Sequence, residues 1–404
     1  MLVWREFFLS WRGLAAVGLF YFLAKVAFSV LVQPAPETIE DYQIAQNLAA
    51  GRGYCLLPTL GPTAVKVPVY PLFLALFVRL FGAGNVFPIV VAQHILLAGV
   101  PLLLLGLGQA LGMRTVGLCA GYLFLLHPSY FYFSNVIETT NLFVPLSILT
   151  AILCVRVLRS GDSAHPGLAG LASGVLILTQ PLVAPCILAW TVLLALRKRW
   201  KQLVMAVVIC LGVILPWSIR NAWVFHRFVP TKSPLWMNFY MGYMPLSHGR
   251  AEFDIIPEST KAWVHHTERT IDNVKMEAHY KDIFLGALRQ SPLLYVRKTI
   301  RQAWVYWWIP PRYQADHSWS FLIVRKLPVI ILNVFFIGGL VLFFRKNTFL
   351  GLGILLGLIY FTTVYALTGP GCIRFKLDIE WLELFPVAAL LVRLRVMGTP
   401  KNGL

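Results

Sequence analysis

Long apolar stretches recur from one end of the chain to the other, separated by short polar or basic segments. A helix needs about 20 apolar residues to cross the hydrocarbon core of a bilayer. A shorter run can also serve as a span where Pro or Gly interrupts it. By that measure the chain has about ten spanning helices. They are predicted at residues 13–33, 86–110, 115–130, 136–158, 167–180, 181–197, 203–219, 327–344, 348–368 and 379–394. The pattern therefore predicts an all-α, polytopic membrane protein.

Two of these spans depend on a proline. The apolar run over 167–196 contains Pro181, and a proline inside a helix removes one backbone hydrogen bond and breaks or kinks the helix. We therefore expect two helices that meet there. The first span, 13–33, is not followed by a small-residue cleavage site, so we expect a retained helix and not a signal peptide.

Two polar segments are much longer than the other connections, and both fall on the outer side of the predicted bundle. The first, 34–86, contains helical patterns over 42–50 and 70–81. The second of these is too short to span and is predicted to lie at the membrane interface. The other long segment, 220–326, contains a helical pattern near 258–290. The predicted divisions are an N-terminal transmembrane module (1–219), an outer-face region (220–326) and C-terminal transmembrane helices with a short cytoplasmic tail (327–404).

Composition agrees with a membrane protein, and charge sets its orientation. Hydrophobic residues make up 58% and charged residues 13%. The net charge of +18 comes largely from basic residues that flank the apolar spans on one side, such as Arg156 with Arg159 and Arg345 with Lys346. Cytoplasmic ends carry such an excess, so the charge indicates orientation and not a nucleic-acid partner. The same count leaves a few basic residues on the outer side: Arg220, Arg227, Lys232, Arg374 and Lys376.

Motifs of several enzyme classes are absent from the sequence. There is no P-loop, dinucleotide fingerprint, GxSxG or HExxH, and the cysteines and histidines do not follow a zinc or thioredoxin spacing. Cys55 and Cys372 both fall in predicted outer loops, which leaves open whether they pair.

Three carboxylates crowd the start of the first outer loop, in PETIEDY: Glu37, Glu40 and Asp41. Ionised groups beside hydrocarbon are costly unless they are paired or solvated, so a simple anchor has no use for them. On a helix Glu37 and Glu40 share a face, whereas Asp41 is turned by about 100° from Glu40, so one acid should face a cavity. Such an acid can act as a general base, with Glu37 or Asp41 favoured. The alternative is a set of acids that cap the helix N-terminus.

Other charged residues lie at the same predicted level. Glu138 opens the fourth span, where it can support an acceptor, pair with Arg374, ligate a divalent cation or be solvated. Arg220 in PWSIRN and Arg374 in GPGCIRFKLDIE are placed at the outer surface, and a guanidinium suits a phosphate. The alternative for both is an anchor for lipid headgroups. Lys66 and Lys376 are further candidates of the same kind.

Taken in order, these motifs resemble those of the GT-C superfamily of integral membrane glycosyltransferases. The resemblance is to the bacterial branch grouped with dolichyl-phosphate-mannose protein mannosyltransferases and the lipid A aminoarabinose transferase, and it covers about residues 10–395. The motifs that carry it are IAQNLAAGRGY, GPTAVKVPVYPLFLALFVRLFG, ETTNLF, GLASGVLILTQP, PWSIRNAWVFHRFVP and IRFKLDIEWLELFPVAALL.

The resemblance implies an enzyme that moves a sugar from a polyprenyl-phosphate carrier to a lipid, glycan or protein acceptor. The reaction would take place on the outer or periplasmic face of the plasma membrane, the inner membrane in bacteria. In the family a first-loop acid is the presumed base, and an Arg-aromatic pair before the last span, here Arg374 and Phe375, is placed at the carrier phosphate. A metal ion assists some members, so a need for a divalent cation stays open. Residues 220–326 are expected to recognise the acceptor.

The sequence departs from the family pattern at several positions. Lys66 replaces a common Arg, Gln180 replaces the Arg of a common LTRP, and Asp378 and Trp381 replace prolines. These changes indicate a distinct acceptor or a lost activity. Two other functions stay open, a transporter or flippase of a lipid-linked glycan and a non-catalytic membrane partner. A transporter should carry polar groups near the bilayer midplane, whereas these spans are expected to be nearly free of charge.

Overall fold

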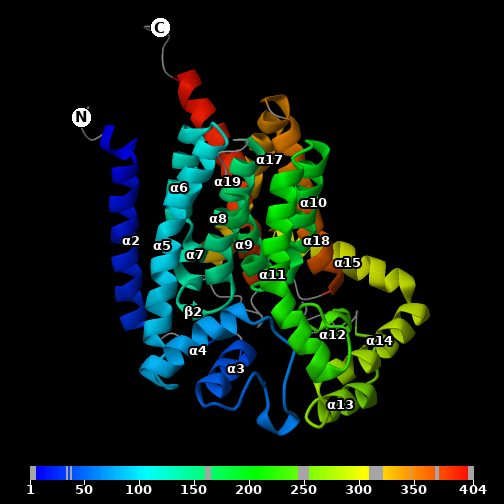
Figure 1. Cartoon of the computed structure of the whole chain (residues 1–404). Helices are drawn as coiled ribbons and strands as arrows, with labels where there is room; N and C mark the ends of the chain where they lie inside the picture. Colours follow the sequence, from blue (N-terminus) through cyan, green and yellow to red (C-terminus); the bar gives the residue numbers. More distant parts are fainter. Residues whose placement is uncertain are drawn as a thin grey trace.

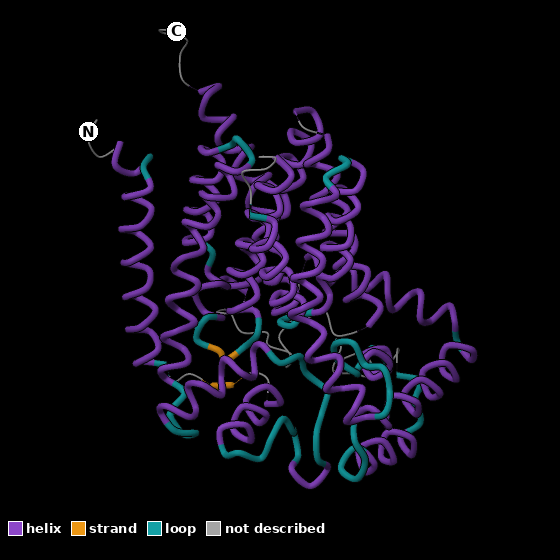
Figure 2. Tube along the Cα trace, viewed as in Figure 1, coloured by secondary structure: helices purple, strands orange, loops and turns teal. Residues whose placement is uncertain are grey.

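The computed structural model describes residues 6–32, 35–36, 39–159, 165–243, 254–308, 322–346, 348–368 and 373–398. Helices make up most of these residues, and the two strands are very short (Figure 2). Long helices form a bundle, and shorter helices cover one end of it (Figure 1). The chain is thus an all-α, polytopic membrane protein, as predicted.

Ten helices of the bundle coincide with the ten predicted spans. They are α2 (Trp11–Leu31), α5 (Phe87–Ala110), α6 (Arg114–Leu126), α8 (Thr140–Arg159), α9 (Pro166–Ile177), α10 (Ala184–Leu196), α11 (Trp200–Phe225), α17 (Leu327–Lys346), α18 (Thr348–Thr368) and α19 (Ile373–Gly398). Among the described residues, six helices are long and apolar enough to cross a membrane unaided: α2, α5, α8, α11, α17 and α18. The helices α6, α9 and α10 are shorter, and α19 carries charged residues.

The predicted break at Pro181 is confirmed. Helix α9 ends at Ile177, a 3-10 turn η3 (Pro181–Val183) follows, and α10 begins at Ala184. Helix α9 packs closely on α11, because Gly170 and Gly174 face the α11 backbone and an added Cβ at Gly170 would collide with the carbonyl of Ala206. Small residues allow such close approach between membrane helices.

Shorter helices form a layer at the end of the bundle opposite the start of α2 and the end of α19 (Figure 1). They are α3 (Ile39–Ala49), η1 (Pro58–Leu60), α4 (Val69–Phe81), α12 (Leu235–Met241), α13 (Glu258–Thr267), α14 (Asn273–Gln290) and α15 (Pro292–Trp308). Both long polar segments therefore lie on one side, as the charge pattern predicted. The helices α3, α4, α13 and α14 match the predicted patterns, whereas α12 and α15 were not predicted.

Specific contacts hold this layer together and attach it to the bundle. The carboxylate of Glu277 on α14 accepts hydrogen bonds from the backbone N–H groups that begin α12. Lys298 on α15 is buried and donates to the carbonyl oxygens of Ala366 and Leu367 near the end of α18, at 3.1 and 2.9 Å. A cation at a helix C-terminus satisfies free carbonyls and complements the helix dipole. The outer layer is thereby fixed to the spanning helices.

A small parallel sheet joins the first outer loop to the start of α8. Strand β1 (Ala35–Pro36) pairs with β2 (Val136–Ile137), which follows α7 (Pro128–Phe133). Gln93 on α5 supports the junction by donating to the carbonyl of Val136 at 2.9 Å and accepting from the hydroxyl of Tyr70 at 2.8 Å. Glu138 follows β2 directly, so this pairing places it beside the first loop.

The expectation that the spans are nearly free of charge is wrong. A buried set of charges lies inside the bundle, where a π-helical turn η6 (Leu322–Lys326) precedes α17. Arg325 Nη1 is 3.0 Å from Glu380 Oε2, and His127 Nε2 is 3.4 Å from the same oxygen. Lys376 pairs with Glu383, and both side chains are fully buried. Glu380 and Glu383 lie about 9 and 14 Å along α19 from Arg374, at about 1.5 Å per residue.

Candidate active site

Five charged side chains from four separate segments gather at one end of the bundle, the end that the charge pattern predicts to be the outer one. Glu40 and Asp41 lie on α3, Lys66 precedes α4, Glu138 precedes α8, and Arg374 lies in the first turn of α19. They form two ion pairs that lie close enough for the charge of Arg374 to act on both Glu40 and Lys66. We call these five residues the outer site.

The first pair separates the roles of two neighbouring acids. Lys66 Nζ is 3.3 Å from Asp41 Oδ2 and 3.7 Å from Glu40 Oε2. The side chain of Asp41 is 3% exposed, whereas that of Glu40 is 40% exposed. The charge of Lys66 lowers the pKa of Glu40 despite the opposing effect of burial. Burial lowers the pKa of Lys66, but the two carboxylates outweigh it and leave that pKa raised.

The second pair joins α8 to α19. Arg374 Nη1 lies 3.0 Å from Glu138 Oε2 and 3.1 Å from Oε1, and the backbone N–H of Thr139 donates to Oε1 at 3.0 Å. Glu138 is buried, with 2% exposure. Its pairing with Arg374 is one of the alternatives that the sequence left open. The guanidinium also lies over the ring of Phe375, at 4.5 Å from the centroid.

Arg220 binds the first outer loop. Its guanidinium donates to the carbonyl oxygens of Thr63 at 2.9 Å and Tyr54 at 3.3 Å. It also lies over the ring of Trp217, at 4.9 Å from the centroid. These contacts hold the loop against the outer end of α11, and a role of Arg220 at a phosphate stays a prediction.

Lys232, in the loop after α11, is a further cation at this end of the bundle. Its Nζ donates to Gln180 Oε1 at 3.4 Å. Burial, followed by the charges of Lys66 and Arg374, lowers the pKa of Lys232 to about 8. In the sequence, Lys232 was one of several basic residues on the predicted outer side. The departure from the family pattern at Gln180 was the signal that could have linked positions 180 and 232.

Asp378 lies one helical turn beyond Arg374 and is 3% exposed. Its carboxylate accepts from the hydroxyl of Thr140 at 2.8 Å and from that of Tyr365 at 3.3 Å. Asp378 therefore ties the start of α19 to α8 and α18. Lys376, a weaker candidate from the sequence, lies with Glu383 inside the bundle.

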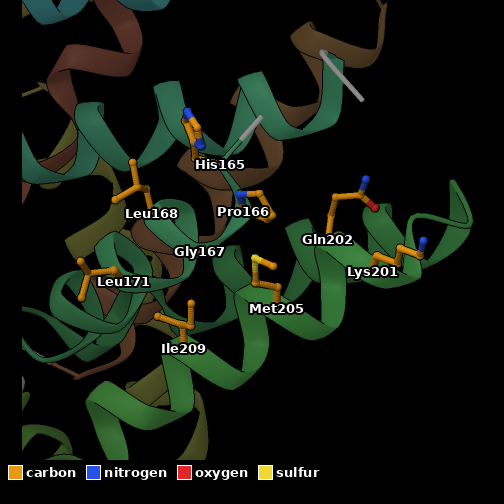
Figure 3. A pocket seen from close by; sticks show the side chains of 9 residues that line it. All are labelled: His165, Pro166, Gly167, Leu168, Leu171, Lys201, Gln202, Met205 and Ile209. Carbon is orange, nitrogen blue, oxygen red and sulfur yellow. The ribbon is translucent and has the colours of Figure 1, made fainter. Parts of the chain in front are cut away.

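A cavity of about 270 Å³ separates the first outer loop from the outer-face region. Its lining includes Glu40, Leu57, Thr63 and Val65 on one side and Met237, His265, Glu268, Arg269 and Asp272 on the other. Glu40 is the member of the outer site that lines it. A larger cavity of about 610 Å³ lies between α9 and α11 near Lys201, at the start of α11 (Figure 3). It is at the other end of α11 from the outer site.

The described residues do not bring three His, Cys, Asp or Glu side chains together in a way that could hold a metal ion. The three acids of the outer site are already paired, Glu40 and Asp41 with Lys66 and Glu138 with Arg374. These residues therefore do not fit a metal centre. Glu37 and Cys372 lie outside the described residues, so their predicted roles stay predictions.

Comparison with known proteins gives a family model and several solved structures. Residues 65–219 match the model described as dolichyl-phosphate-mannose-protein mannosyltransferase. No curated protein sequence matches the chain. The solved archaeal oligosaccharyltransferase AglB from Archaeoglobus fulgidus, in complex with an inhibitory peptide and a dolichol-phosphate, is similar with a TM-score of 0.57 and 14% identity. That match covers 98% of this chain and 53% of the AglB chain, so the protein spans about half the length of AglB.

Two structures of ArnT from Cupriavidus metallidurans are also similar. The apo form gives a TM-score of 0.39 at 15% identity, over 93% of this chain and 76% of ArnT. The form bound to undecaprenyl phosphate gives 0.40 at 14% identity, over 94% and 77%.

Proposed function

Because the chain has the fold of the GT-C superfamily of membrane glycosyltransferases, we propose that it transfers a sugar from a polyprenyl-phosphate carrier to an acceptor at the outer membrane surface. The observation that carries the proposal is the meeting of Glu40, Asp41 and Lys66 with Glu138 and Arg374 at one end of the bundle. The resemblance in the sequence implied a first-loop acid as the base and Arg374 at the carrier phosphate. The AglB structure contains a dolichol-phosphate, a lipid phosphate of the class that we propose for the carrier.

Glu40 is our candidate for the general base. It is the more exposed acid and lines the cavity, whereas Asp41 is enclosed and fixes Lys66. In the proposed step, Glu40 takes the proton from an acceptor hydroxyl or amine as that atom bonds to the anomeric carbon. The bond between the anomeric carbon and the phosphate oxygen breaks, and the carrier phosphate leaves with the electron pair. The sugar is transferred with inversion.

The cations would stabilise the leaving group. Negative charge develops on the carrier phosphate in the transition state, and preorganised cations aimed at such charge lower the barrier. Lys66 and Arg374 are each held by a buried carboxylate, Asp41 and Glu138, which fixes their positions before substrate binds. We propose that both act on the phosphate from these positions.

The acceptor would enter between the two outer segments. The 270 Å³ cavity lies between the first outer loop, with Glu40, and residues of the outer-face region on and after α12 and α13, which supports a role of residues 220–326 in acceptor recognition. A lipid, glycan or protein acceptor remains within the proposal. We place the outer site on the periplasmic or exterior face of the plasma membrane, because the basic residues flank the other end of the spans.

The experiment replaces Glu37, Glu40, Asp41 and Glu138 singly by the matching amide and measures transfer from a radiolabelled polyprenyl-phosphate sugar in purified membranes. We expect Glu40→Gln to lose most activity and Asp41→Asn to lose less, because Asp41 acts through Lys66. If all four variants transfer at the wild-type rate, the proposed mechanism is wrong.

A transporter of lipid-linked glycans is the second candidate, favoured by the charges inside the bundle on α19. Reconstituted vesicles separate the two functions. A transporter moves a labelled lipid-linked sugar across the bilayer without a change in its bonds, whereas the proposed enzyme releases the carrier phosphate and labels the acceptor.

A further inference from the structure

The cavity of about 610 Å³ between α9 and α11 lies at the other end of α11 from the outer site, and the proposed reaction does not use it. The side chains of Leu168, Leu171 and Met205 on its walls are 51%, 45% and 50% exposed. The cavity therefore opens as a groove on the outside of the bundle, where membrane lipid lies around a spanning helix. We call it the α9–α11 groove, and Figure 3 labels the residues that line it.

The groove depends on a glycine near the start of α9. Further along α9, Gly170 brings the backbones of α9 and α11 into contact. At Gly167 an added Cβ would lie 3.0 Å from Ile209 Cδ1 and 3.8 Å from Met205 Sδ. The space beside Gly167 is thus left open by α9, with Met205 and Ile209 as its wall on α11. An elongated apolar group can lie in this space.

The two ends of the groove differ in polarity. His165, Lys201 and Gln202 come from the beginnings of α9 and α11, whereas Leu171 and Ile209 lie further along these helices (Figure 3). Ile209 is two helical turns beyond Lys201, so the apolar part extends about 12 Å along α11, at about 1.5 Å per residue. Polar groups at the membrane surface followed by an apolar channel match a lipid headgroup followed by its acyl chain.

The polar end of the groove is positive. In the turn before α11, Arg197 and Arg199 donate to carbonyl oxygens at the end of α8, whereas Lys201 is exposed and lines the groove. The first turns of α9 and α11 contain no acidic residue, and no acid is among the described residues that line the groove. Helix N-termini carry a partial positive charge, so the starts of both helices add to the field of Lys201.

We propose that the α9–α11 groove binds one anionic phospholipid, with its headgroup phosphate at Lys201 and His165 and an acyl chain along Met205 and Ile209. The charge of the polar end favours this occupant over a neutral lipid, because a basic side chain near the membrane surface attracts anionic headgroups. This end of the bundle is the predicted cytoplasmic one, and the cytoplasmic leaflet carries a negative surface potential. The bound lipid holds the starts of α9 and α11 together. The site is separate from the outer site and does not depend on the proposed function.

Native mass spectrometry of the purified full chain in detergent measures the affinity for single lipids. Wild type should bind dioleoyl-phosphatidylglycerol more tightly than dioleoyl-phosphatidylcholine, which has the same acyl chains and no net charge. Lys201→Ala should weaken binding of phosphatidylglycerol about fivefold, the contribution of one basic side chain near the surface, and leave binding of phosphatidylcholine unchanged. Lys201→Arg should keep the wild-type affinity, because it keeps the charge.

Two further variants separate the groove from general surface charge. Met205→Trp keeps the charge and fills the apolar part, so it should weaken binding of phosphatidylglycerol. Its unfolding midpoint in lipid-free detergent should stay close to wild type, because Met205 is half exposed. Arg114→Ala is the matched control, since Arg114 is an exposed cation that begins α6 at the same end of the bundle, outside the groove. It should bind phosphatidylglycerol like wild type.

Equal affinity of wild type for the two lipids would overturn the proposal, because neutral and anionic lipids would then cover this face alike. An unchanged affinity for phosphatidylglycerol in Lys201→Ala or in Met205→Trp would place the lipid elsewhere and would also overturn it. An equal loss in Arg114→Ala and Lys201→Ala would reduce the effect to general surface charge, with the same consequence. None of these measurements involves sugar transfer, so the proposed function stands or fails independently of them.

Discussion

Two sets of charged residues each include members of the same helix, α19, and their surroundings differ. The outer site at its start includes Arg374 and is partly open, with Glu40 40% exposed and Lys66 21% exposed. The inner set, His127, Arg325, Lys376, Glu380 and Glu383, is almost completely buried. In the proposed enzyme, the exposed charges can meet the substrate and exchange protons, whereas the enclosed pairs hold helices together. The outer set should therefore control activity and the inner set folding.

The largest expected effect is on folding. Arg325→Met leaves the Glu380 carboxylate buried beside His127 without its arginine, and breaking a buried ion pair costs about 3–5 kcal/mol of the free energy of unfolding. Unfolding of the purified protein in detergent measures this cost. The double variant Arg325→Met/Glu380→Leu should recover much of the loss, because no unpaired charge remains. Equal stability of Arg325→Met and wild type would contradict the assignment of the inner set to folding.

The second largest effect is expected on activity, from a change to Arg374 in the first turn of α19. Arg374→Gln removes a cation from the proposed phosphate and should lower the rate of sugar transfer about 100-fold. Glu138→Gln is its partner variant and should lower the rate less, because Arg374 keeps its charge. Transfer of label from a polyprenyl-phosphate sugar, corrected for folded protein, gives both values. A rate for Arg374→Gln within a factor of two of wild type would contradict the role.

The smallest effect is a shift in pH dependence. The charge of Lys66 holds the pKa of Glu40 below its usual value, so Glu40 stays ionised as a base until the pH falls through that lowered pKa. Lys66→Met should move the acid limb of the transfer rate to higher pH. The same sign applies to stability: the Glu40 interaction is present above its unfolded pKa and is lost as the pH falls through the folded pKa. If Lys66→Met leaves the acid limb at the same pH, Glu40 is not the group that takes the proton in the rate-determining step.

The positions of the spanning helices could be predicted from the sequence because each depends only on residues within the helix and next to it. A run of apolar residues must be long enough for the bilayer, and a proline such as Pro181 must interrupt it. The inner charges could not be read in this way. Glu380 lies in a span by position, and it is tolerated there because Arg325 and His127 reach it from elements 55 and 253 residues away in sequence.

The outer site was predicted in its members but not in its geometry. The crowding of Glu40 and Asp41 and the outer position of Arg374 are sequence features, so all three were candidates. Which acid faces the cavity depends on how α3 packs, and that packing turns Asp41 inward and Glu40 outward. The contact between Lys232 and Gln180 depends on the fold for the same reason.

The most direct test of this account is the transfer rate per folded molecule of Glu40→Gln, measured in a single turnover beside Glu380→Gln. Both variants change one glutamate near α19 to its amide, one in the outer site and one in the inner set. The account predicts that Glu40→Gln transfers sugar about 10²- to 10⁴-fold more slowly with only a small change in the unfolding midpoint, because Glu40 is partly exposed. It predicts that Glu380→Gln lowers the midpoint and that its folded fraction transfers at close to the wild-type rate. A wild-type rate for Glu40→Gln would contradict the central claim.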